Sequence, residues 1–425
     1  MFFEPPRRLA RLAGVVAGNL LALTTTGFVH AGQAPGFAAL PVIATAGCWD
    51  ARPDDVLGAV RECAHKGVQV MTMAVRPGTD GRPRAATRYE ATACTPSANC
   101  VFLDDLLDEM PAPKLLLQVS PTLLDAVQAD VGRHGAADRV MIEPMLDRPN
   151  GNVASAMVAP GLHYSRRRLL SPRPMMVHIL QVDLDTSGLR FVVSPGHPGR
   201  DAAGKPTEFV ARKTTDFVRE EKLDAAINAT YFLPFDGGHL LDKPYAAIVD
   251  QAVTVDGVSM ANGHMDSDYR SNDPRSDGSL CIQGHHLSIT LKHCPAGTTD
   301  AVGAGPVLML DGKRQKLGGP QLSYYTANEP RTAIGIDKAG RHLWLVVVDG
   351  RQANYSDGMP LSELTAMLRE LGADSAMNMD GGGSSTMVLT RDGQPRIVNS
   401  PVHTGIPGRE RPIGNQLGIS IANSP

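Results

Sequence analysis

The chain has 425 residues, with 41 basic and 44 acidic side chains and a net charge of −3. This length exceeds one typical domain and predicts two, each able to bury its own core. The balanced charge gives no general attraction to nucleic acid or to anionic membranes, so we expect neither as a partner.

The first residues have the pattern of an export signal. A cluster of arginines precedes an apolar stretch over residues 12–29, and a Val-His-Ala site ends at Ala31. These features predict a signal peptide over residues 1–31 and a mature protein that is secreted or periplasmic. An N-terminal membrane anchor is the alternative. We favour cleavage without stable membrane insertion, because polar residues such as Asn19 interrupt the stretch and it is short for a bilayer span.

The six cysteines, an even number, suit an oxidising compartment. No C-x-x-C motif or regular Cys/His spacing indicates a zinc site, so we expect disulfides, although sequence alone does not fix their connectivity. The nearest-neighbour pairs are Cys48 with Cys63, Cys94 with Cys100, and Cys281 with Cys294.

Helical and strand patterns alternate along residues 40–145. In chain order they are a helix at 54–67, a strand at 68–75, a helix at 102–110, a strand at 114–120, a helix at 122–135 and a strand at 139–144. Such alternation predicts a parallel sheet in a smaller α/β domain.

This first region resembles half of a glycerophosphodiester phosphodiesterase barrel, through "PDDVLGAVRECAHKGVQVMTMAVRPGTDGRP" and "VFLDDLLDEMPAPKLLLQVS". That family has a Glu-x-Asp metal pair on the strand where this chain has Met71 and Met73, and its early His-Arg-Gly has no counterpart near Gly47. The resemblance therefore implies a domain at 40–145 that has lost its metal site and is not catalytic.

Residues 146–173 are rich in proline, glycine and arginine without a sustained period, which predicts a linker. Beyond it, strand patterns dominate. They comprise two strands within 175–195, a helix running into a strand over 214–232, a hairpin around 338–340 and a helix over 359–372. Together they predict a strand-rich α+β domain over residues 174–425.

The most informative stretch is "DSAMNMDGGGSS", residues 374–385. A buried strand delivers Asp380 to its end, and three successive glycines follow where the backbone must turn sharply or let a group approach closely. We expect an anion-binding nest of main-chain amides with two added hydroxyl donors, or else a tight turn with a structural aspartate. The residues of this expected nest are Gly381, Gly382, Gly383, Ser384 and Ser385.

Three further segments place polar groups at strand ends. Arg331 begins one strand, and Asp349 and Arg351 end the next; guanidinium groups bind phosphate in a bidentate manner. Asn228 and Tyr231 end an earlier strand and offer an amide and a ring to a sugar. Taken singly, each also fits a surface ion pair, a hairpin residue or a core aromatic.

Taken together, these segments resemble the phosphodiester glycosidase family over most of residues 175–420. The resemblance is carried by "INATYF", "GAGPVLMLDG", "RTAIGID", "VVVDGRQANYSDGMP", "MNMDGGGSSTMVL" and "VNSPVHTGIPGRERPIGNQLGI". Two departures are Thr230, which replaces a second glycine common in the family, and a cysteine-bearing insertion at about 256–298 that could cover or reshape the site.

The resemblance implies an exported hydrolase that cleaves the glycosidic bond of sugar-1-phosphodiesters, for example N-acetylglucosamine-1-phosphate diesters, and releases sugar and a phosphomonoester. It implies that Arg331 and Arg351 hold the phosphodiester. A carboxylate would act at the anomeric carbon as nucleophile or base. The candidates, in order of preference, are Asp380, Asp349 and Asp357. Asn228, Ser356 and Ser384 would position the sugar or the attacking water. Arg411 either contacts the ligand or, together with Asn415, fixes the last strand to the sheet.

We expect no metal and no cofactor. The acid-rich segment 263–278 lacks the order of an EF-hand, and the loop histidines lack metal-ligand spacing and are expected in solvent. These histidines are His239, His264, His285, His286 and His403. The main alternative is a secreted phosphoglycan- or carbohydrate-binding protein without turnover. A nucleotide phosphohydrolase is disfavoured because the glycine turn has neither P-loop spacing nor a lysine.

Overall fold

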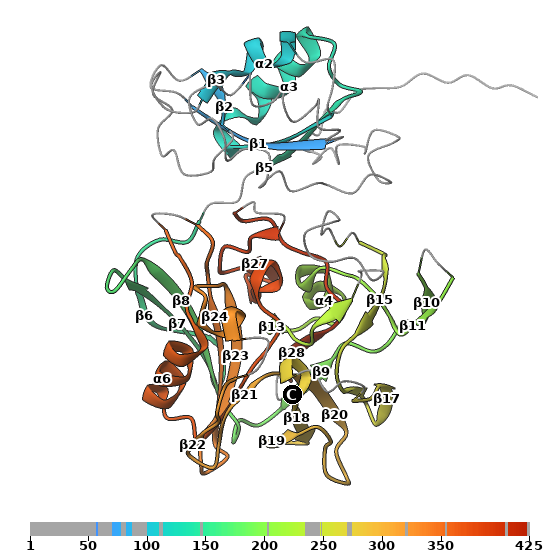
Figure 1. Cartoon of the computed structure of the whole chain (residues 1–425), viewed down its shortest axis with the longest axis vertical. Helices are drawn as coiled ribbons and strands as arrows, with labels where there is room; N and C mark the ends of the chain where they lie inside the picture. The colour runs from blue at the N-terminus through green and yellow to red at the C-terminus, as the bar shows by residue number, and fades with distance from the viewer. Residues whose placement is uncertain are drawn as a thin grey trace, which may run out of the picture.

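The computed structural model describes residue 57 and then residues 70–422, apart from short gaps at 78–81, 87–99, 110–113, 145–147, 202–203, 234–246, 248, 270–273, 319–321, 353–354 and 404–406 (Figure 1). The expected signal peptide, His239, and the expected disulfides of Cys48 with Cys63 and of Cys94 with Cys100 fall wholly or partly outside the described residues. The helix expected at 54–67 is described only at Leu57.

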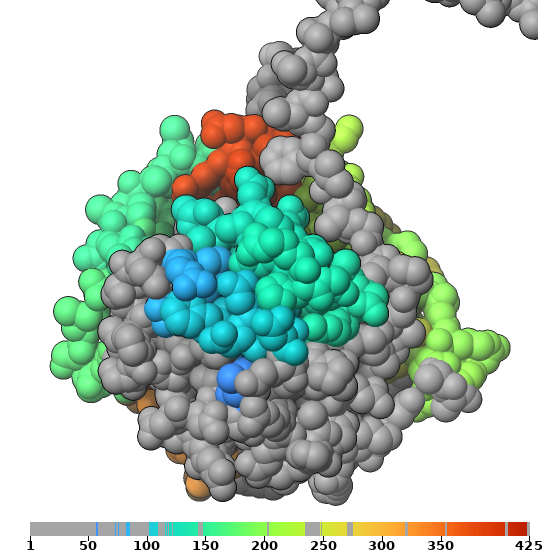
Figure 2. Space-filling view, turned by 90° about the horizontal axis from the view of Figure 1, so that it is seen from above, coloured from blue at the N-terminus to red at the C-terminus, as the bar shows by residue number. Residues whose placement is uncertain are grey.

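The N-terminal region has a five-stranded sheet in the order β3-β2-β1-β4-β5, in which β4 pairs in parallel with both β1 and β5. Its elements are β1 (Val70–Pro77), β2 (Pro83–Ala86), β3 (Cys100–Phe102), α2 (Leu103–Glu109), β4 (Lys114–Val119), η1 (Pro121–Leu123), α3 (Leu124–Arg133) and β5 (Val140–Pro144). Apolar residues of the sheet and both helices, including Leu106, Leu117 and Val127, form one buried cluster. The predicted α/β character is confirmed, but the sheet is mixed rather than wholly parallel, since β2 pairs antiparallel with both β1 and β3. Figure 2 shows these helices at the surface of one end of the molecule.

The segment expected to be a linker forms a hairpin instead. β6 (Val153–Ala159) pairs with β7 (Leu162–Leu169), and β7 pairs with β8 (Met175–Asp183) of the next sheet. The linker prediction was wrong for these strands because β6 is an edge strand with no buried side chain, so its residues need no regular apolar alternation. The domain boundary itself stays a prediction.

Two sheets face one another in the larger region, and their order places the expected site residues. The first has eight strands, β22-β21-β25-β23-β24-β8-β7-β6, and the second has five, β27-β26-β13-β28-β9. The bounds not yet given are β9 (Leu189–Val193), β13 (Ala225–Asn228), β21 (Val307–Leu310), β22 (Lys313–Arg314), β23 (Arg331–Ile336), β24 (His342–Val348), β25 (Ser375–Asn378), β26 (Met387–Arg391), β27 (Gln394–Ile397) and β28 (Gln416–Ile421).

Smaller sheets complete the region. A second five-stranded sheet, β17-β16-β20-β18-β19, contains much of the expected insertion, and shorter sheets join β12-β15-β14 and β10-β11. The bounds are β10 (Gly199–Arg200), β11 (Pro206–Thr207), β12 (Phe209–Val210), β14 (Phe232–Leu233), β15 (Ala252–Val255), β16 (Ser259–Ala261), β17 (His264–Ser267), η2 (Pro274–Ser276), β18 (Gly278–Gln283), β19 (His286–Leu291) and β20 (Asp300–Ala304). The disulfide Cys281–Cys294 closes the β18–β19 hairpin, so this one of the three expected pairs is confirmed.

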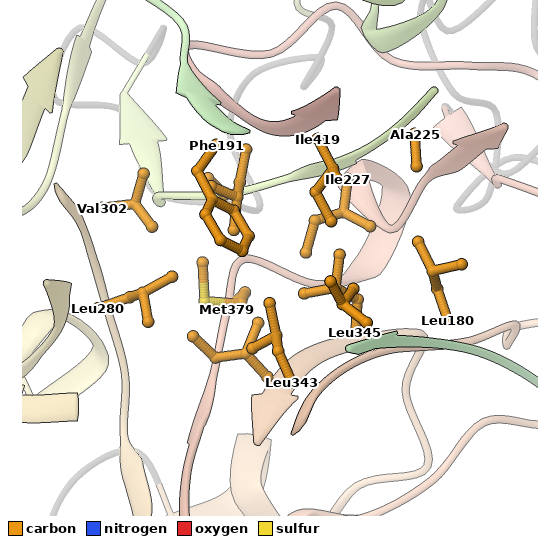
Figure 3. Close-up of a cluster of buried hydrophobic side chains, with 14 of the residues drawn as sticks. Leu180, Phe191, Ala225, Ile227, Leu280, Val302, Leu343, Leu345, Met379 and Ile419 are labelled. Atoms are coloured by element: carbon orange, nitrogen blue, oxygen red, sulfur yellow. The ribbon is translucent and has the colours of Figure 1, made fainter. Parts of the chain in front are cut away.

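The main core lies between the two large sheets (Figure 3). Leu343 and Leu345 of β24 point from the eight-stranded sheet toward Ile227 of β13 and Ile419 of β28. The alternate residues of β24, such as Trp344, join a second cluster on the opposite face. Because both faces of β24 are buried, its sequence is an almost unbroken apolar run.

Within the described part of this region, three helices lie against the framework: α4 (Thr214–Glu220), α5 (Leu322–Thr326) and α6 (Leu361–Leu371). The leucines of α6 pack on the outer face of the eight-stranded sheet over β21, β25 and β23, and Gly372 ends the helix with a left-handed φ of 108°. The predicted helix, the hairpin of β23 with β24 and the strand-rich α+β class are all confirmed. Among the described residues, every helix is too short or too polar to cross a bilayer.

Candidate functional site

Asp380 lies where the chain passes from one large sheet to the other. β25 belongs to the eight-stranded sheet, β26 to the five-stranded sheet, and the glycine turn joins them. The Asp380 amide donates to the carbonyl oxygen of Ala229 at 3.0 Å, and Asn228 Nδ2 donates to the Asp380 carbonyl oxygen at 2.5 Å. Hydrogen bonds from its main chain to Asn228 at the end of β13 and to the next residue therefore fix the position of this aspartate.

The carboxyl group of Asp380 is buried, with 8% of the residue exposed. Burial raises its pKa from 3.8 to about 6, although a hydrogen bond from Ser384, the charge of Arg411, the Gly381 amide and the charge of Arg275 each lower it. A carboxyl group with this pKa is mostly ionised at neutral pH and still exchanges a proton readily. Perturbed carboxyl groups of this kind are concentrated at functional sites.

Two guanidinium groups lie against the glycine turn. A Cβ added to Gly383 would lie 2.7 Å from Cζ of Arg411, and one added to Gly382 would lie 3.2 Å from Nη2 of Arg351. Gly382 also has a φ of 61°, which other residues rarely adopt. These glycines are therefore needed because arginines approach the turn, as well as for its backbone conformation.

Ser384 connects the aspartate with one of these arginines. Its hydroxyl donates to the Asp380 carboxylate and accepts a hydrogen bond from Arg411 Nη1 at 3.2 Å. Arg411 Nε donates to His403 Nδ1 at 3.1 Å. His403 was expected in solvent but is buried; burial and the charges of Arg411 and Arg409 hold its pKa well below the usual value, so its neutral ring can accept that bond.

The amides of the turn differ from the expected anion-binding nest. The Gly382 amide donates to the Pro330 carbonyl oxygen at 2.9 Å, and the Ser384 amide donates to the Gly381 carbonyl oxygen at 3.2 Å. The Gly381 amide bonds the Asp380 carboxylate. The turn forms a 3₁₀ helix, η3 (Gly382–Ser384), and these three amides already have acceptors within the protein. An anion here would therefore be held chiefly by the arginines.

Arg351 is paired with a carboxylate that the sequence reading missed. Its Nε donates to Glu329 Oε2 at 2.5 Å, and its backbone has a φ of 58°. The Arg351 side chain is 46% exposed, which leaves part of the guanidinium accessible. Glu329 lies two residues before Arg331 in "NEPRTA", and its proximity to Arg351 depends on the pairing of β23 with β24.

Arg331, which is expected to hold the phosphodiester, bonds main-chain carbonyl groups instead. It is fully buried and donates to the carbonyl oxygens of Met359, Tyr324 and Ala327 at 2.9, 2.7 and 3.0 Å. Its Cζ lies 4.4 Å from the centroid of the Tyr324 ring. The Nη1 atom is buried without a hydrogen-bond partner among the described residues. Arg331 therefore holds the α5 segment and Tyr324 in place, rather than presenting an open phosphate clamp.

Two tyrosines lie beside the turn. The hydroxyl groups of Tyr231 and Tyr324 are 3.2 Å apart, and Asn378 Nδ2 donates to Tyr231 Oη at 2.9 Å. A Cβ on Gly381 would be 3.1 Å from Tyr324 Oη. Burial raises the pKa of Tyr231 well above its usual value, so its hydroxyl stays protonated. This aromatic pair joins the Asp380 region, as expected for Tyr231.

Asp349 is a structural residue in this arrangement. Both of its oxygens are buried and accept four hydrogen bonds, from His178 Nε2, Tyr355 Oη, Asn399 Nδ2 and the Ser400 amide, at 3.0, 3.0, 3.0 and 2.8 Å. A carboxylate with its acceptor positions filled in this way is poorly placed to attack a substrate. The second-choice catalytic assignment of Asp349 is therefore not supported by its geometry.

The remaining expected residues are buried or half-buried. Asn228 is fully buried; its Oδ1 accepts from Thr332 Oγ1 at 2.8 Å and from the Thr386 amide at 3.1 Å, so it braces the turn instead of contacting sugar. Ser356 Oγ likewise bonds the Asp349 carbonyl oxygen at 2.5 Å. The Ser385 hydroxyl is buried without a partner among the described residues, and Asp357 is half-buried beside Arg351.

No cluster of three or more His, Cys, Asp or Glu side chains suited to a metal ion occurs in the described part of the chain.

Residues 221–420 match the family model for phosphodiester glycosidases, which confirms the resemblance over that range. No curated protein matches the chain. The resemblance of the N-terminal region to a glycerophosphodiester phosphodiesterase stays a prediction.

Similar solved structures share low sequence identity with the chain. The zebrafish N-acetylglucosamine-1-phosphodiester alpha-N-acetylglucosaminidase catalytic domain, auto-inhibited by its pro-peptide, is 21% identical, with 64% of this chain and 87% of that chain covered and a TM-score of 0.42. A hypothetical protein from Synechocystis is 16% identical with a TM-score of 0.40; the match covers 61% of this chain and only 62% of that one. A putative exported protein from Burkholderia pseudomallei K96243 is 16% identical, with 58% and 74% covered and a TM-score of 0.40.

Proposed function

Because residues 221–420 match the phosphodiester glycosidase family, we propose that this chain is a hydrolase that cleaves the glycosidic bond of sugar-1-phosphodiesters, with N-acetylglucosamine-1-phosphate diesters as one example. The products are free sugar and a phosphomonoester. The observation that carries the proposal is the buried Asp380 carboxylate, which shares the Ser384 hydroxyl with Arg411.

Arg351 and Arg411 bind the phosphate in this proposal. Their guanidinium groups approach adjacent glycines of the same turn, Gly382 and Gly383, so one phosphate group can contact both. As the glycosidic bond breaks, negative charge grows on the departing phosphate oxygen. Fixed cations at that point stabilise the transition state more than the ground state. A phosphate is already a good leaving group, so the mechanism needs little help from a general acid.

Asp380 acts on the anomeric carbon, as nucleophile or as the base that activates water. Its pKa of about 6 supports this role, because the carboxylate is ionised at neutral pH but remains basic enough to accept a proton. Ser384 holds one side of the carboxylate, and Asn228 holds its main chain. These bonds limit the motion of the reacting group before substrate arrives.

The ring of Tyr231 and the hydroxyl groups of Tyr231 and Tyr324 bind the sugar. An aromatic face packs on the apolar face of a sugar ring, and the tyrosine hydroxyls donate to or accept from its hydroxyl groups. We also propose an extracytoplasmic location, which the disulfide Cys281–Cys294 and the apolar N-terminal stretch support.

The test is sugar release from α-N-acetylglucosamine-1-phosphodiesters and other sugar-1-phosphodiesters, with Asp380→Asn beside the wild type. Asp392→Asn, in the exposed turn between β26 and β27, is the matched control. We expect release by the wild type and the control and its loss in Asp380→Asn. If the wild type binds these ligands in calorimetry but releases no sugar, the protein is a phosphoglycan-binding protein instead.

A further inference from the structure

The inserted segment brings another arginine to the Asp380 region. Arg275 lies on η2, immediately before β18, and its Cζ is 6.0 Å from the centroid of the Tyr231 ring. Its charge acts on the Asp380 carboxylate together with that of Arg411. Arg275 is half-buried.

Contacts with the main framework hold η2 in place. Asp277 Oδ1 accepts a hydrogen bond from the Val307 amide at 3.0 Å, and Val307 of β21 pairs with Met377 of β25. A Cβ on Gly278 would lie only 2.6 Å from Val307 Cγ2, so the start of β18 packs directly on β21. The segment that carries Arg275 is therefore attached to β21, which pairs with the strand that leads to Asp380.

The position of Arg275 differs from that of the other two arginines. Arg351 and Arg411 lie against the glycine turn, which the proposed function assigns to the phosphate. Arg275 instead lies over the ring that the proposed function assigns to the sugar. Arg351 and Arg411 are thus the cations on the phosphate side, and Arg275 is a separate cation on the sugar side.

Resting on the proposed function, we infer that Arg275 is a substrate-recognition residue that binds an acidic group on the glycosyl unit itself. The substrates are then 1-phosphodiesters of acidic sugars, in which the glycosyl unit carries a carboxylate or a second phosphate. A guanidinium group binds either anion through paired hydrogen bonds. A neutral sugar offers no anion to this cation and binds more weakly.

The experiment measures dissociation constants by calorimetry for three probes that differ only in the sugar: glucose 1-phosphate, glucuronic acid 1-phosphate and glucose 1,6-bisphosphate. The proteins are the wild type, Arg275→Gln, Arg275→Lys and the control Lys292→Gln. Lys292 is an exposed cation of the same insertion, so its replacement changes the charge equally. Thermal unfolding of all four proteins checks that the insertion remains folded.

We expect the wild type and Lys292→Gln to bind at least one acidic probe about tenfold or more tightly than glucose 1-phosphate. Arg275→Gln should remove this preference, and Arg275→Lys should keep part of it. The tighter of the two acidic probes identifies the carboxylate or the phosphate as the preferred group. Equal binding of all three probes by the wild type overturns the inference. So does an equal loss for all three in Arg275→Gln, since Arg275 would then hold the 1-phosphate.

This binding test does not depend on turnover. If no sugar-1-phosphodiester is hydrolysed but the acidic preference depends on Arg275, the proposed function fails and the recognition role stands. If hydrolysis occurs without any acidic preference, the proposed function stands and the inference about Arg275 fails.

Discussion

Asn399 donates a hydrogen bond from Nδ2 to Asp349 Oδ1 at 3.0 Å, and the same amide group donates to the Ser385 carbonyl oxygen at 2.9 Å. Asn399 Oδ1 in turn accepts from the Met387 amide at 2.8 Å. A buried carboxylate at the end of β24 is thereby connected to both ends of the segment that follows the glycine turn. These buried hydrogen bonds hold the segment after the turn against the end of β24.

Replacing Asp349 with Asn should destabilise the fold. The variant loses a charge that four donors surround, and its amide NH₂ group faces those donors. Breaking such a buried network typically costs about 3 kcal/mol or more. The free energy of unfolding from urea titration measures this, with Asp392→Asn as the exposed control. Wild-type stability combined with complete loss of sugar release would instead make Asp349 catalytic.

Gly383→Ala should weaken phosphate binding. The new Cβ collides with the Arg411 guanidinium and moves it from the turn. We expect the dissociation constant for a sugar 1-phosphate to rise about tenfold or more, which corresponds to about 1.4 kcal/mol. Gly318→Ala is the control, because no described atom lies within 4 Å of its added Cβ. Unchanged affinity in Gly383→Ala would show that Arg411 does not contact the phosphate.

The rate of sugar release should fall as the pH drops through about 6, because protonation of Asp380 removes the reactive carboxylate. The pH dependence of kcat/KM measures this. A profile that stays flat from pH 7 to pH 4.5 would contradict the assignment.

The effect of pH on the stability of the fold has the opposite sign to its effect on the rate. The folded-state pKa of about 6 exceeds 3.8, so the protonated carboxyl is favoured by folding and this contribution is lost as pH rises from about 4 through 6.

Asp380→Asn cannot ionise, so it should gain stability relative to the wild type as pH rises across that window. The gain should be on the order of 2 kcal/mol between pH 4 and pH 7. Urea unfolding of both proteins at the two pH values measures it. A stability difference independent of pH would mean that Asp380 does not titrate near pH 6.

Glu329→Gln should affect binding more than stability. The Glu329–Arg351 pair orients a half-exposed guanidinium, and an ion pair of this exposure contributes only about 0–1 kcal/mol to folding. We expect a severalfold rise in the dissociation constant for a sugar 1-phosphate and a nearly unchanged melting temperature. Glu370→Gln, which breaks the exposed pair with Arg167, is the control. An equal change in affinity in both variants would show that Glu329 does not position Arg351 for binding.

The sequence by itself determined the elements with strong local patterns. The apolar run of β24, the leucine face of α6 with Gly372 after it, and the turn around Asp380 each follow from short-range period and backbone freedom. The family resemblance rests on the same segments, since a strand, a carboxylate and three glycines are adjacent in the chain.

Only the tertiary structure decided what each polar side chain does. Asp349 and Asp380 both follow apolar strands. The Asp349 carboxylate accepts four hydrogen bonds, whereas the Asp380 carboxylate accepts one from Ser384 and lies near arginines of distant segments. The edge strand β6 likewise has no buried side chain to impose an apolar pattern. Glu329 and Arg275 reach the site because strand pairing and the packing of β18 on β21 bring them there. Local sequence encodes the period of an element, whereas partners and burial depend on which elements pack together.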